Sequence, residues 1–346
     1  MEEMNCPEEK GKFGKKMGLW GCLGLVGAGF FLFLTVSVIV IAWSCASCAP
    51  VFSDSSSDGI ETELLSGDPD AESAIAVIDI QGIIVAGEEG FGSQTASPEK
   101  ICQLIRTASE APEVKAILIR LDTPGGEVTA SDVIRHELEN CGKPVVAQME
   151  SMAASGGYFI ATAARRIVAN RTTMTGSIGV VIRTLNYYKF FRLLGLRECI
   201  YASGKMKAML SGGRDIESDE EKVVQALVME TFEDFLLAVS KSRSIPMEKL
   251  RESDFADGRI LSGVQAHKAG LVDRLGYFAD AVEEAEKLAG IPAGSAKAVR
   301  YHSGSGLMAL LASMAAPAKR LSVSFNGGTP GEFTMTPGKA YFLPAF

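Results

Sequence analysis

The chain has 346 residues and a formal net charge of −8, and it contains no stretch rich in lysine and arginine, so no nucleic-acid-binding surface is expected. Its seven cysteines are scattered, which argues against a disulfide-built scaffold, and the one Cys-x-x-Cys pair, Cys45 and Cys48, stands by itself. We therefore expect neither a metal site nor a cofactor.

The first 73 residues indicate a membrane anchor ahead of the folded part. Residues 1–17 mix acidic and basic side chains and form the expected cytoplasmic tail. Residues 18–43 are uncharged and long enough to cross a hydrocarbon core of ~30 Å, which favours a transmembrane signal anchor over a cleaved signal peptide. Because Lys15 and Lys16 precede this span, the rest of the chain is expected on the exported side of the cell (inner) membrane. Residues 44–73 are rich in Ser, Asp, Gly and Ala and predict a solvated linker.

Short apolar runs alternate with helical patterns from residue 74 to residue 290. This alternation predicts an α/β domain with a largely parallel sheet. The predicted strands cover residues 74–80, 115–121, 144–147, 166–169 and 177–181. One predicted helix begins at Pro98, one ends at Asn140, and others span residues 158–164, 218–242 and 278–289.

The longest predicted helix, 218–242, has apolar positions at helical spacing, as expected for a core or subunit contact. Ser218 and Glu221 predict a capping box at its start.

Residues 291–346 are rich in Gly, Ala and Pro and predict a loosely held C-terminal tail. The tail contains two apolar stretches, residues 307–316 and 340–346. Two hypotheses follow: the tail docks on apolar surface, or it enters a substrate groove as a self-substrate or plug.

Ser155 lies in a turn of small residues between a predicted strand and a predicted helix. Gly156 and Gly157 leave room for another backbone or a ligand to come close. The first amides of the helix have no intrahelical partner and point towards negative charge. A hydroxyl beside such donors suits an acyl-transfer nucleophile, whereas the plainer interpretation is a tight turn that only permits packing.

A serine nucleophile needs a base, and none of the three histidines lies in a small-residue turn like that of Ser155. These are His136, His267 and His302. A lysine can serve instead if a small-residue pocket desolvates it and so favours its neutral form. The loop 203–214 holds Lys205 and Lys207 among Gly, Ser, Ala and Met, although an ordinary surface loop is the plainer explanation.

Five motifs, in this order, resemble those of the signal peptide peptidase A family, short form, of the Clp/crotonase-like superfamily. They are Asp122-Thr-Pro-Gly-Gly126, Met152-Ala-Ala-Ser-Gly-Gly-Tyr158, Thr175-Gly-Ser-Ile-Gly179, Ser203-Gly-x-x-Lys207 and Gly263-x-Gln-Ala-x-x-x-Gly-Leu-Val-Asp273. The resemblance implies a Clp/crotonase-like peptidase domain with repeated β-β-α units over residues 74–290.

The resemblance also implies the site residues. Ser155 is the implied nucleophile, Lys207 the general base, and Ser177 a helper serine that orients the lysine. The amides of Gly126 and Gly156 form the implied oxyanion hole. Because the family assembles its sites between neighbouring protomers, a homo-oligomer with shared sites is expected.

Two departures from the family pattern keep alternatives open near the base. The family commonly has an acid after the lysine and Ser-Pro a few residues later, where this chain has Ala208 and Ser211-Gly212. Lys205 is therefore an alternative base, and Gly125 is an alternative oxyanion donor.

The function implied by the resemblance is that of a membrane-anchored serine endopeptidase with a Ser-Lys dyad. Its expected substrates are cleaved signal peptides or other apolar membrane-associated peptides. The alternative is a non-proteolytic scaffold or partner-binding ring on the same fold. The presence of both Ser155 and Lys207 favours the peptidase, and acyl-CoA chemistry on the related crotonase fold does not suit an exported domain.

Overall fold

The computed structural model describes residues 59–87, 95–303 and 341–342, which all belong to one compact unit spanning residues 58–346. The predicted cytoplasmic tail, 1–17, and the predicted anchor, 18–43, lie outside the described residues. Within the described ranges, no helix combines the length and the apolar character needed to cross a bilayer.

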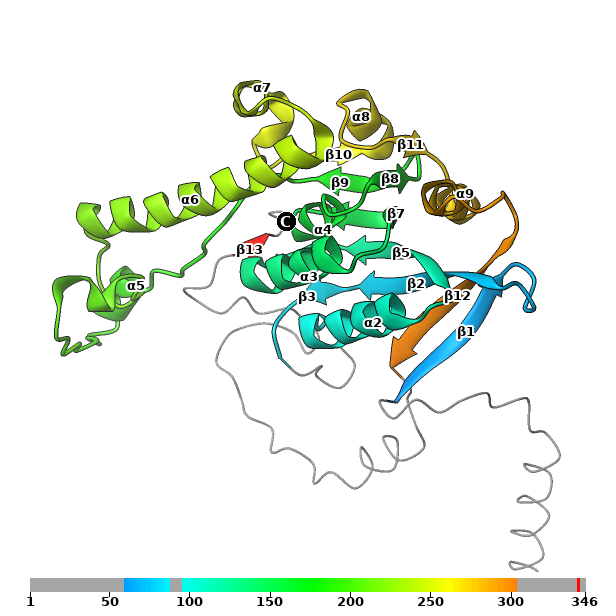
Figure 1. Ribbon diagram of the computed structural model, residues 1–346. Coiled ribbons are helices and arrows are strands. Elements are labelled where there is room, and N and C mark those ends of the chain that lie inside the picture. The colour runs from blue at the N-terminus through cyan, green and yellow to red at the C-terminus, as the bar shows by residue number, and fades with distance from the viewer. Residues whose placement is uncertain (1–58, 88–94, 304–340, 343–346) are drawn as a thin grey trace, which may run out of the picture. The chain divides into compact units, whose positions relative to one another are not determined.

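A mostly parallel sheet forms the centre of the molecule (Figure 1). In the described part of the chain its strands follow the order β1-β12-β2-β5-β7-β8-β11, and β9 pairs with the end of β7 and with β10. Two of these pairs are antiparallel, β1 with β12 and β9 with β10. The strands are β1 (Ile60–Ser66), β2 (Ser73–Gln81), β5 (Val114–Thr123), β7 (Val145–Ala154), β8 (Arg166–Ala169), β9 (Met174–Gly176), β10 (Ile260–Ser262), β11 (Arg274–Leu275) and β12 (Ala296–Ser303).

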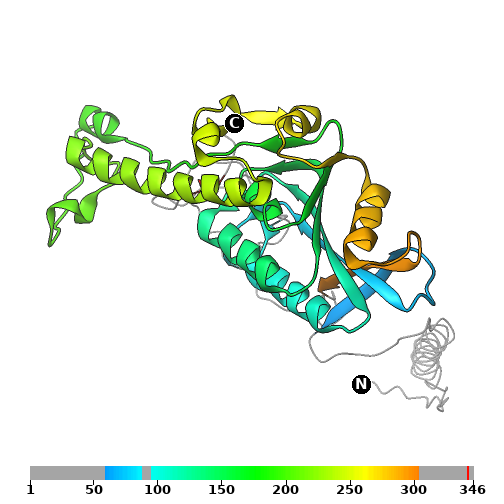
Figure 2. The same ribbon diagram turned by 45° about the horizontal axis from the view of Figure 1, so that its top comes forward.

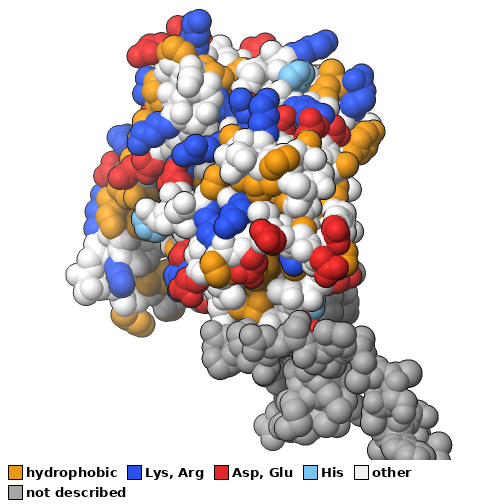
Figure 3. Space-filling model, turned by 45° about the vertical axis from the view of Figure 1, so that its right-hand side comes forward, with side chains coloured by type: hydrophobic (Ala, Val, Ile, Leu, Met, Phe, Trp, Pro, Cys, Tyr) orange, Lys and Arg blue, Asp and Glu red, His pale blue; other side chains and the backbone are white. Residues whose placement is uncertain are grey.

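Helices cover both faces of this sheet, because alternate residues of each strand point to opposite sides. Ile78 and Ile80 of β2 belong to the larger core, which is shared with α2, α3, α4 and part of α6. Ile75 and Val77 belong to a smaller core that contains Ala281 of α9. These helices are α2 (Pro98–Glu110), α3 (Val128–Asn140), α4 (Gly156–Ala161), α6 (Ser218–Arg243) and α9 (Phe278–Ala289). On the face shown in Figure 3, acidic and basic side chains are interspersed.

A second, small sheet lies at the end of the first one. Its order is β13-β6-β3-β4, with β3 (Ile83–Ile84), β4 (Thr95–Ala96), β6 (Gly126–Glu127) and β13 (Tyr341–Phe342). β6 directly continues the path of β5, so this small sheet adjoins the carboxyl ends of the central strands.

An arm projects from the domain (Figures 1 and 2). It contains α5 (Tyr188–Leu193), the 3-10 turn η1 (Lys205–Ala208) and the first half of α6. The arm carries large apolar side chains in solvent, among them Leu185, Leu193 and Tyr201, which are 78%, 83% and 97% exposed. The remaining short elements are α7 (Met247–Arg251), η2 (Asp254–Ala256) and α8 (Gly263–Lys268).

The structure confirms the predicted alternation of strands and helices. The last helix spans Phe278–Ala289 as predicted, and the helix that follows Ser97 begins at Pro98. The long helix is also present, but its capping box uses Glu217 and Glu220, one residue earlier than the predicted pair of Ser218 and Glu221.

Two predicted boundaries of the folded domain are wrong, because the folded part begins and ends with one more strand. The predicted linker 44–73 contains β1, and the predicted loose tail 291–346 contains β12, which lies between β1 and β2. Both strands owe their place to main-chain pairing between segments far apart in sequence, which leaves little trace in local composition.

The predicted strand 177–181 is also wrong. The strand is β9, Met174–Gly176, and the chain leaves the sheet at Ser177, whose φ is 51°. A positive φ interrupts the extended conformation, and the apolar run after Ser177 therefore does not continue the strand.

Candidate active site

Three neighbouring parallel strands, β5, β7 and β9, bring the predicted site residues other than Lys207 to one edge of the sheet. Thr123 at the end of β5 pairs with Ala153 in β7, and Ala154 pairs with Gly176 in β9. Paired strands lie about 4.8 Å apart. The residues that follow these pairs, Gly126, Ser155 and Ser177, therefore leave the sheet side by side, at the edge where α/β sheets hold their sites.

Ser155 has a strained backbone and a buried hydroxyl. Its φ is 53° and its ψ is −113°, a conformation that costs a non-glycine residue about 1–3 kcal/mol. The fold imposes it through two main-chain hydrogen bonds: Ser155 N donates to Gly176 O at 2.8 Å, and Ser155 O accepts from Phe159 N at 2.8 Å. The Ser155 Oγ atom is fully buried and has no hydrogen-bond partner among the described residues.

Close packing is enough to explain the glycines around Ser155, without any catalytic role. A Cβ on Gly157 would lie 2.6 Å from Cγ2 of Thr123, and a Cβ on Gly126 would lie 1.8 Å from the Ile84 carbonyl oxygen. Both positions thus require glycine because the helix start and β3 come close to the end of β5. Gly126 thus lies at the end of β5, next to the β7 strand that leads into Ser155, and Gly156 directly follows Ser155.

Gly125 is a poorer oxyanion donor than Gly126. Its N–H already donates to Thr123 Oγ1 at 3.0 Å, and its carbonyl accepts from Ile84 N at 2.9 Å. The φ of Gly125 is 102°, a value that only glycine adopts without strain.

Ser177 lies directly beyond the β9 residue that binds Ser155. It is buried, with a φ of 51°, and its N–H donates to the carbonyl of Arg259 at 2.8 Å. The predicted helper serine thus belongs to the same group as Ser155.

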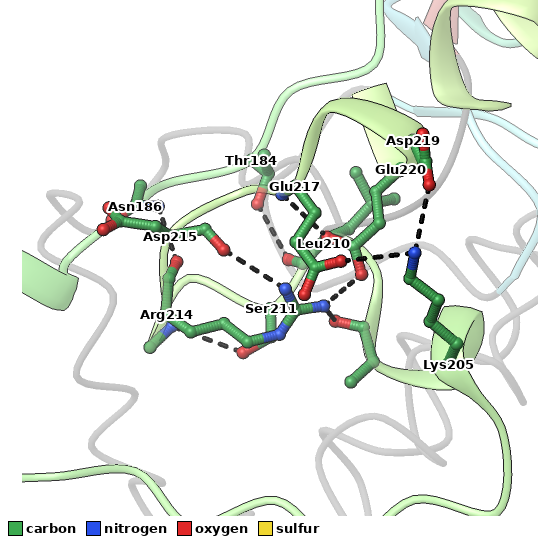
Figure 4. Close-up of polar contacts among 12 residues, drawn as sticks. Thr184, Asn186, Lys205, Leu210, Ser211, Arg214, Asp215, Glu217, Asp219 and Glu220 are labelled. Atoms are coloured by element: carbon green, nitrogen blue, oxygen red, sulfur yellow. Dashed lines mark hydrogen bonds and ion pairs between the residues drawn. The ribbon is translucent and has the colours of Figure 1, made fainter. Parts of the chain in front are cut away.

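The two candidate lysines lie on the arm and differ in their surroundings, and Figure 4 shows Lys205 with its acidic partners. Lys205 Nζ lies 3.0 Å from Asp219 Oδ2 and 3.7 Å from Glu217 Oε2. The hydrogen bond to Asp219 and the charges of both carboxylates raise the pKa of Lys205 above its ordinary value. The small residues around Lys205 in the sequence therefore do not describe its surroundings, because the start of α6 lies against it and supplies two carboxylates. Lys207 is exposed, and its ammonium group has no partner among the described residues.

The arm holds both lysines far from Ser155 of the same chain. Phe159 of α4 packs edge to face against Phe235 of α6, with ring centroids 5.1 Å apart. Asp219, the partner of Lys205, lies more than four helical turns earlier on α6, which corresponds to about 24 Å along the helix. A lysine side chain does not bridge such a distance, and one chain by itself does not bring Ser155 and Lys207 together.

The histidines have other surroundings. His136 is exposed on α3, and His267 Nδ1 lies 3.0 Å from Val272 O, at the end of α8. His302 lies on β12 at the opposite side of the sheet order from β9.

Several residues that position the site were not singled out from the sequence. Thr175 Oγ1 donates to Ala153 O at 2.7 Å, and Asp122 Oδ1 accepts from Met152 N at 3.0 Å, so both hold the end of β7. Tyr158 OH donates to Leu271 O at 3.0 Å, which ties α4 to the segment after α8. These residues lie within the five motifs, so the motifs were the sequence signal that could have identified them.

A cavity of about 340 Å³ opens beside this group, between α3, α4 and α6. Phe159 lines it, and so does Val128, which directly follows β6. Asp132, Asp234 and Lys241 also line it, so the cavity is not purely apolar.

Comparisons with known proteins relate this chain to two peptidase families. The sequence model of peptidase family S49 matches residues 137–292, and that of Clp protease matches residues 72–186. A protein of Synechocystis sp., named provisionally as a protease, is 36% identical over 63% of this chain and 75% of its own length. A protein of Enterococcus faecium, named provisionally as signal peptide peptidase SppA, is 34% identical over 62% of this chain and 63% of its own.

Two further matches differ in how much of their own length aligns with this chain. The chloroplastic serine protease SPPA of Arabidopsis thaliana is 34% identical over 63% of this chain, which spans only 33% of that protein. Among solved structures, a ClpP1 variant from Listeria monocytogenes aligns with 60% of this chain and 94% of its own, with a TM-score of 0.40 and 16% identity.

Proposed function

Because this chain belongs to peptidase family S49, we propose that it is a serine endopeptidase whose nucleophile is Ser155 and whose general base is Lys207 of a neighbouring copy. Neutral Lys207 Nζ takes the proton of Ser155 Oγ as the oxygen attacks the scissile carbonyl carbon. The amides of Gly126 and Gly156 stabilise the oxyanion. The lysine then protonates the departing amine, and water hydrolyses the acyl-enzyme by the reverse steps. Ser177 orients the lysine.

The observation that carries this proposal is the buried, unpartnered hydroxyl of Ser155. A buried hydroxyl without a hydrogen bond costs free energy, and so does the positive φ that holds it. Both costs are typical of a site that keeps its nucleophile ready for a partner. The lysine turn of the arm and α4 are separated by about 24 Å along α6. This distance supports a base that is supplied by a second copy.

The exposed apolar residues of the arm support assembly into an oligomer. Large apolar side chains that are this exposed mark interaction surfaces in soluble domains. The residues concerned are Leu185, Phe190, Leu193, Leu194, Leu196 and Tyr201. An arm that packs on a neighbour would bury them and carry Lys207 to the Ser155 of that neighbour.

We further propose that residues 18–43 anchor the enzyme in the cell membrane with the catalytic domain exported. Its substrates are then apolar peptides such as cleaved signal peptides. The name of the Enterococcus faecium relative supports this substrate class. The charged residues that line the 340 Å³ cavity also suit a polar side chain of the bound peptide.

Labelling by a serine-directed fluorophosphonate tests the nucleophile. Purified protein should be labelled and should cleave signal-type peptides, whereas Ser155→Ala should do neither. A folded wild type that resists labelling and cleaves no peptide would leave the non-proteolytic scaffold as the function.

Co-expression of two inactive variants tests the shared site. Ser155→Ala and Lys207→Ala should each be inactive by itself. In randomly mixed oligomers about a quarter of the sites would combine an intact serine with an intact lysine from the neighbour, so about a quarter of the wild-type activity should return. Persistent inactivity of the mixed oligomers would contradict a base supplied in trans.

A further inference from the structure

We infer that Thr123 is a positioning residue that sets the spacing of the two proposed oxyanion donors, the amides of Gly126 and Gly156. Its hydroxyl group holds the loop that carries the first donor, and its methyl group contacts the helix that carries the second. This role rests on the proposed peptidase function and deepens it, because it names the side chain that connects the two halves of the oxyanion hole.

The hydroxyl group of Thr123 determines the direction of the first donor. The side chain is fully buried at the end of β5, and its Oγ1 atom accepts a hydrogen bond from Gly125 N at 3.0 Å. The Gly125 carbonyl accepts a second one from Ile84 N at 2.9 Å. The C=O and N–H groups of a trans peptide point in opposite directions, so the Gly126 N–H points away from β3. The Thr123 hydroxyl thus fixes the turn that directs this amide.

The methyl group of Thr123 determines the position of the second donor. The Ser155 carbonyl accepts from Phe159 N at 2.8 Å and points along α4, so the Gly156 N–H of the same peptide points out of the helix start. Its position depends on how close α4 comes to β5. A Cβ on Gly157 would lie 2.6 Å from Cγ2 of Thr123 and 3.3 Å from its carbonyl oxygen, so the methyl group is in direct contact with the first turn.

Threonine is the residue type that supplies both groups at this position. Serine has the hydroxyl without the methyl group, and valine has methyl groups without the hydroxyl. Branching at Cβ restricts χ1, which holds both groups in a fixed direction relative to the strand. The two donors must lie within about 2.7–3.1 Å of the developing oxyanion, so a small displacement of either one slows the reaction.

Steady-state kinetics of Thr123→Val test the hydroxyl group. Valine has nearly the same shape but leaves Gly125 N without its partner, so kcat on a signal-type peptide should fall by roughly tenfold to a hundredfold, with KM within about twofold of wild type. Thr123→Ser retains the hydroxyl and should keep most of the wild-type kcat.

The matched control is Thr173→Val, in the loop between β8 and β9. The hydroxyl group of Thr173 is also buried, but it donates to Glu150 O, away from the oxyanion loop. Its removal should lower the urea midpoint and leave kcat within about twofold of wild type. An equal loss of kcat in Thr123→Val and Thr173→Val would overturn the positioning role.

A second pair of variants tests the methyl contact and does not require Thr123→Val to fold. Gly157→Ala places a Cβ atom against Cγ2 of Thr123 and should lower kcat by roughly tenfold or more. Removal of Cγ2 in the double variant Gly157→Ala/Thr123→Ser should recover roughly threefold or more of this loss, a coupling that independent sites do not show. A double variant no more active than Gly157→Ala would overturn the positioning role.

Fluorophosphonate labelling separates this role from the proposed function. In Thr123→Val, Ser155 should still be labelled to completion, but more slowly than in wild type, because the same donors stabilise the oxygen on phosphorus. Labelled Thr123→Val with the kcat of wild type, or with a change in KM alone, overturns the positioning role and not the peptidase function. Wild-type protein that is not labelled and cleaves no peptide overturns both.

Discussion

Lys205 and Lys207 lie on the same 3-10 turn, yet their side chains have different surroundings. The ammonium group of Lys205 binds Asp219 and Glu217, which raises its pKa and keeps it protonated. Lys207 is exposed and has no partner within the described residues. A general base must be unprotonated, and the ion pairs of Lys205 oppose that role by favouring its charged form.

We predict that Lys207→Ala lowers kcat by roughly a thousandfold or more and that Lys205→Ala leaves it within about threefold. The reason is that exposed ion pairs such as Lys205–Asp219 add little to stability or to catalysis. Steady-state rates on one signal-type peptide would measure both variants. An inactive Lys205→Ala beside an active Lys207→Ala would reverse the assignment.

The carboxylate of Asp273 joins β8 to the end of α6. It accepts hydrogen bonds from Ile167 N at 2.8 Å and from Arg243 at 2.8 and 2.9 Å. Burial by itself would raise the pKa of Asp273, but the hydrogen bonds from Arg243 and Ile167 outweigh it, and the pKa lies below its usual value. The carboxylate therefore contributes stability above about pH 4, and that contribution is lost as the pH falls through the lowered pKa.

We predict that Asp273→Asn lowers the free energy of unfolding at pH 7 by about 3–5 kcal/mol, because it leaves the Arg243 guanidinium, 8% exposed, without its partner. Urea denaturation at pH 7 and again below pH 4 would measure it, and the difference from wild type should shrink in acid. The control is Asp257→Asn, whose pair with Arg259 lies in solvent. Its urea midpoint should barely move. Equal midpoints for both variants at pH 7 would contradict the role of Asp273.

At the scale of elements, the arm is stabilised by contacts of its own. Arg214 binds Glu220 and donates to the carbonyl of Ala208 at 2.9 Å, so it joins the 3-10 turn to the start of α6. Arg214 therefore keeps the turn that carries the two lysines in a defined place. Leu193 and Tyr201 of the arm, by contrast, are not covered by any described part of the chain.

We predict that Leu193→Asp disrupts the oligomer and lowers peptidase activity at least tenfold, while the stability of the single domain changes by less than about 0.5 kcal/mol. Analytical ultracentrifugation and peptide cleavage would measure the two effects. Leu64→Asp is the matched control, since Leu64 is 44% exposed on β1, outside the arm. Normal assembly of Leu193→Asp would show that the arm is not the interface.

At the scale of the whole molecule, the proposed anchor and the catalytic domain determine where the enzyme meets its substrates. Residues 18–43 lie outside the described residues, so the prediction rests on their apolar composition and on Lys15 and Lys16 before them.

We predict that protease added outside intact spheroplasts digests the domain from residue 59 onward, and that carbonate washing leaves the chain in the membrane fraction. Deletion of residues 1–57 should release the domain from that fraction. Full protection of the domain in intact spheroplasts, with digestion only after lysis, would place it in the cytoplasm instead.

The sequence by itself determined the α/β class, the positions of the helices α2, α3, α4, α6 and α9 and of four central strands, and the turn that holds Ser155, whereas Gly126 and Ser177 came from the resemblance of the motifs. These depend on local patterns: apolar runs of strand length, helical periodicity, and turns of small residues that have a steric reason wherever they occur. The tertiary structure decided what depends on pairing between distant segments. It added β1 and β12 to the sheet, put β13 beside Gly126, and gave Lys205 its carboxylate partners. It also separated Lys207 from Ser155 along the length of α6, because the distance between two residues far apart in sequence follows from how helices and strands pack and not from their spacing in the chain.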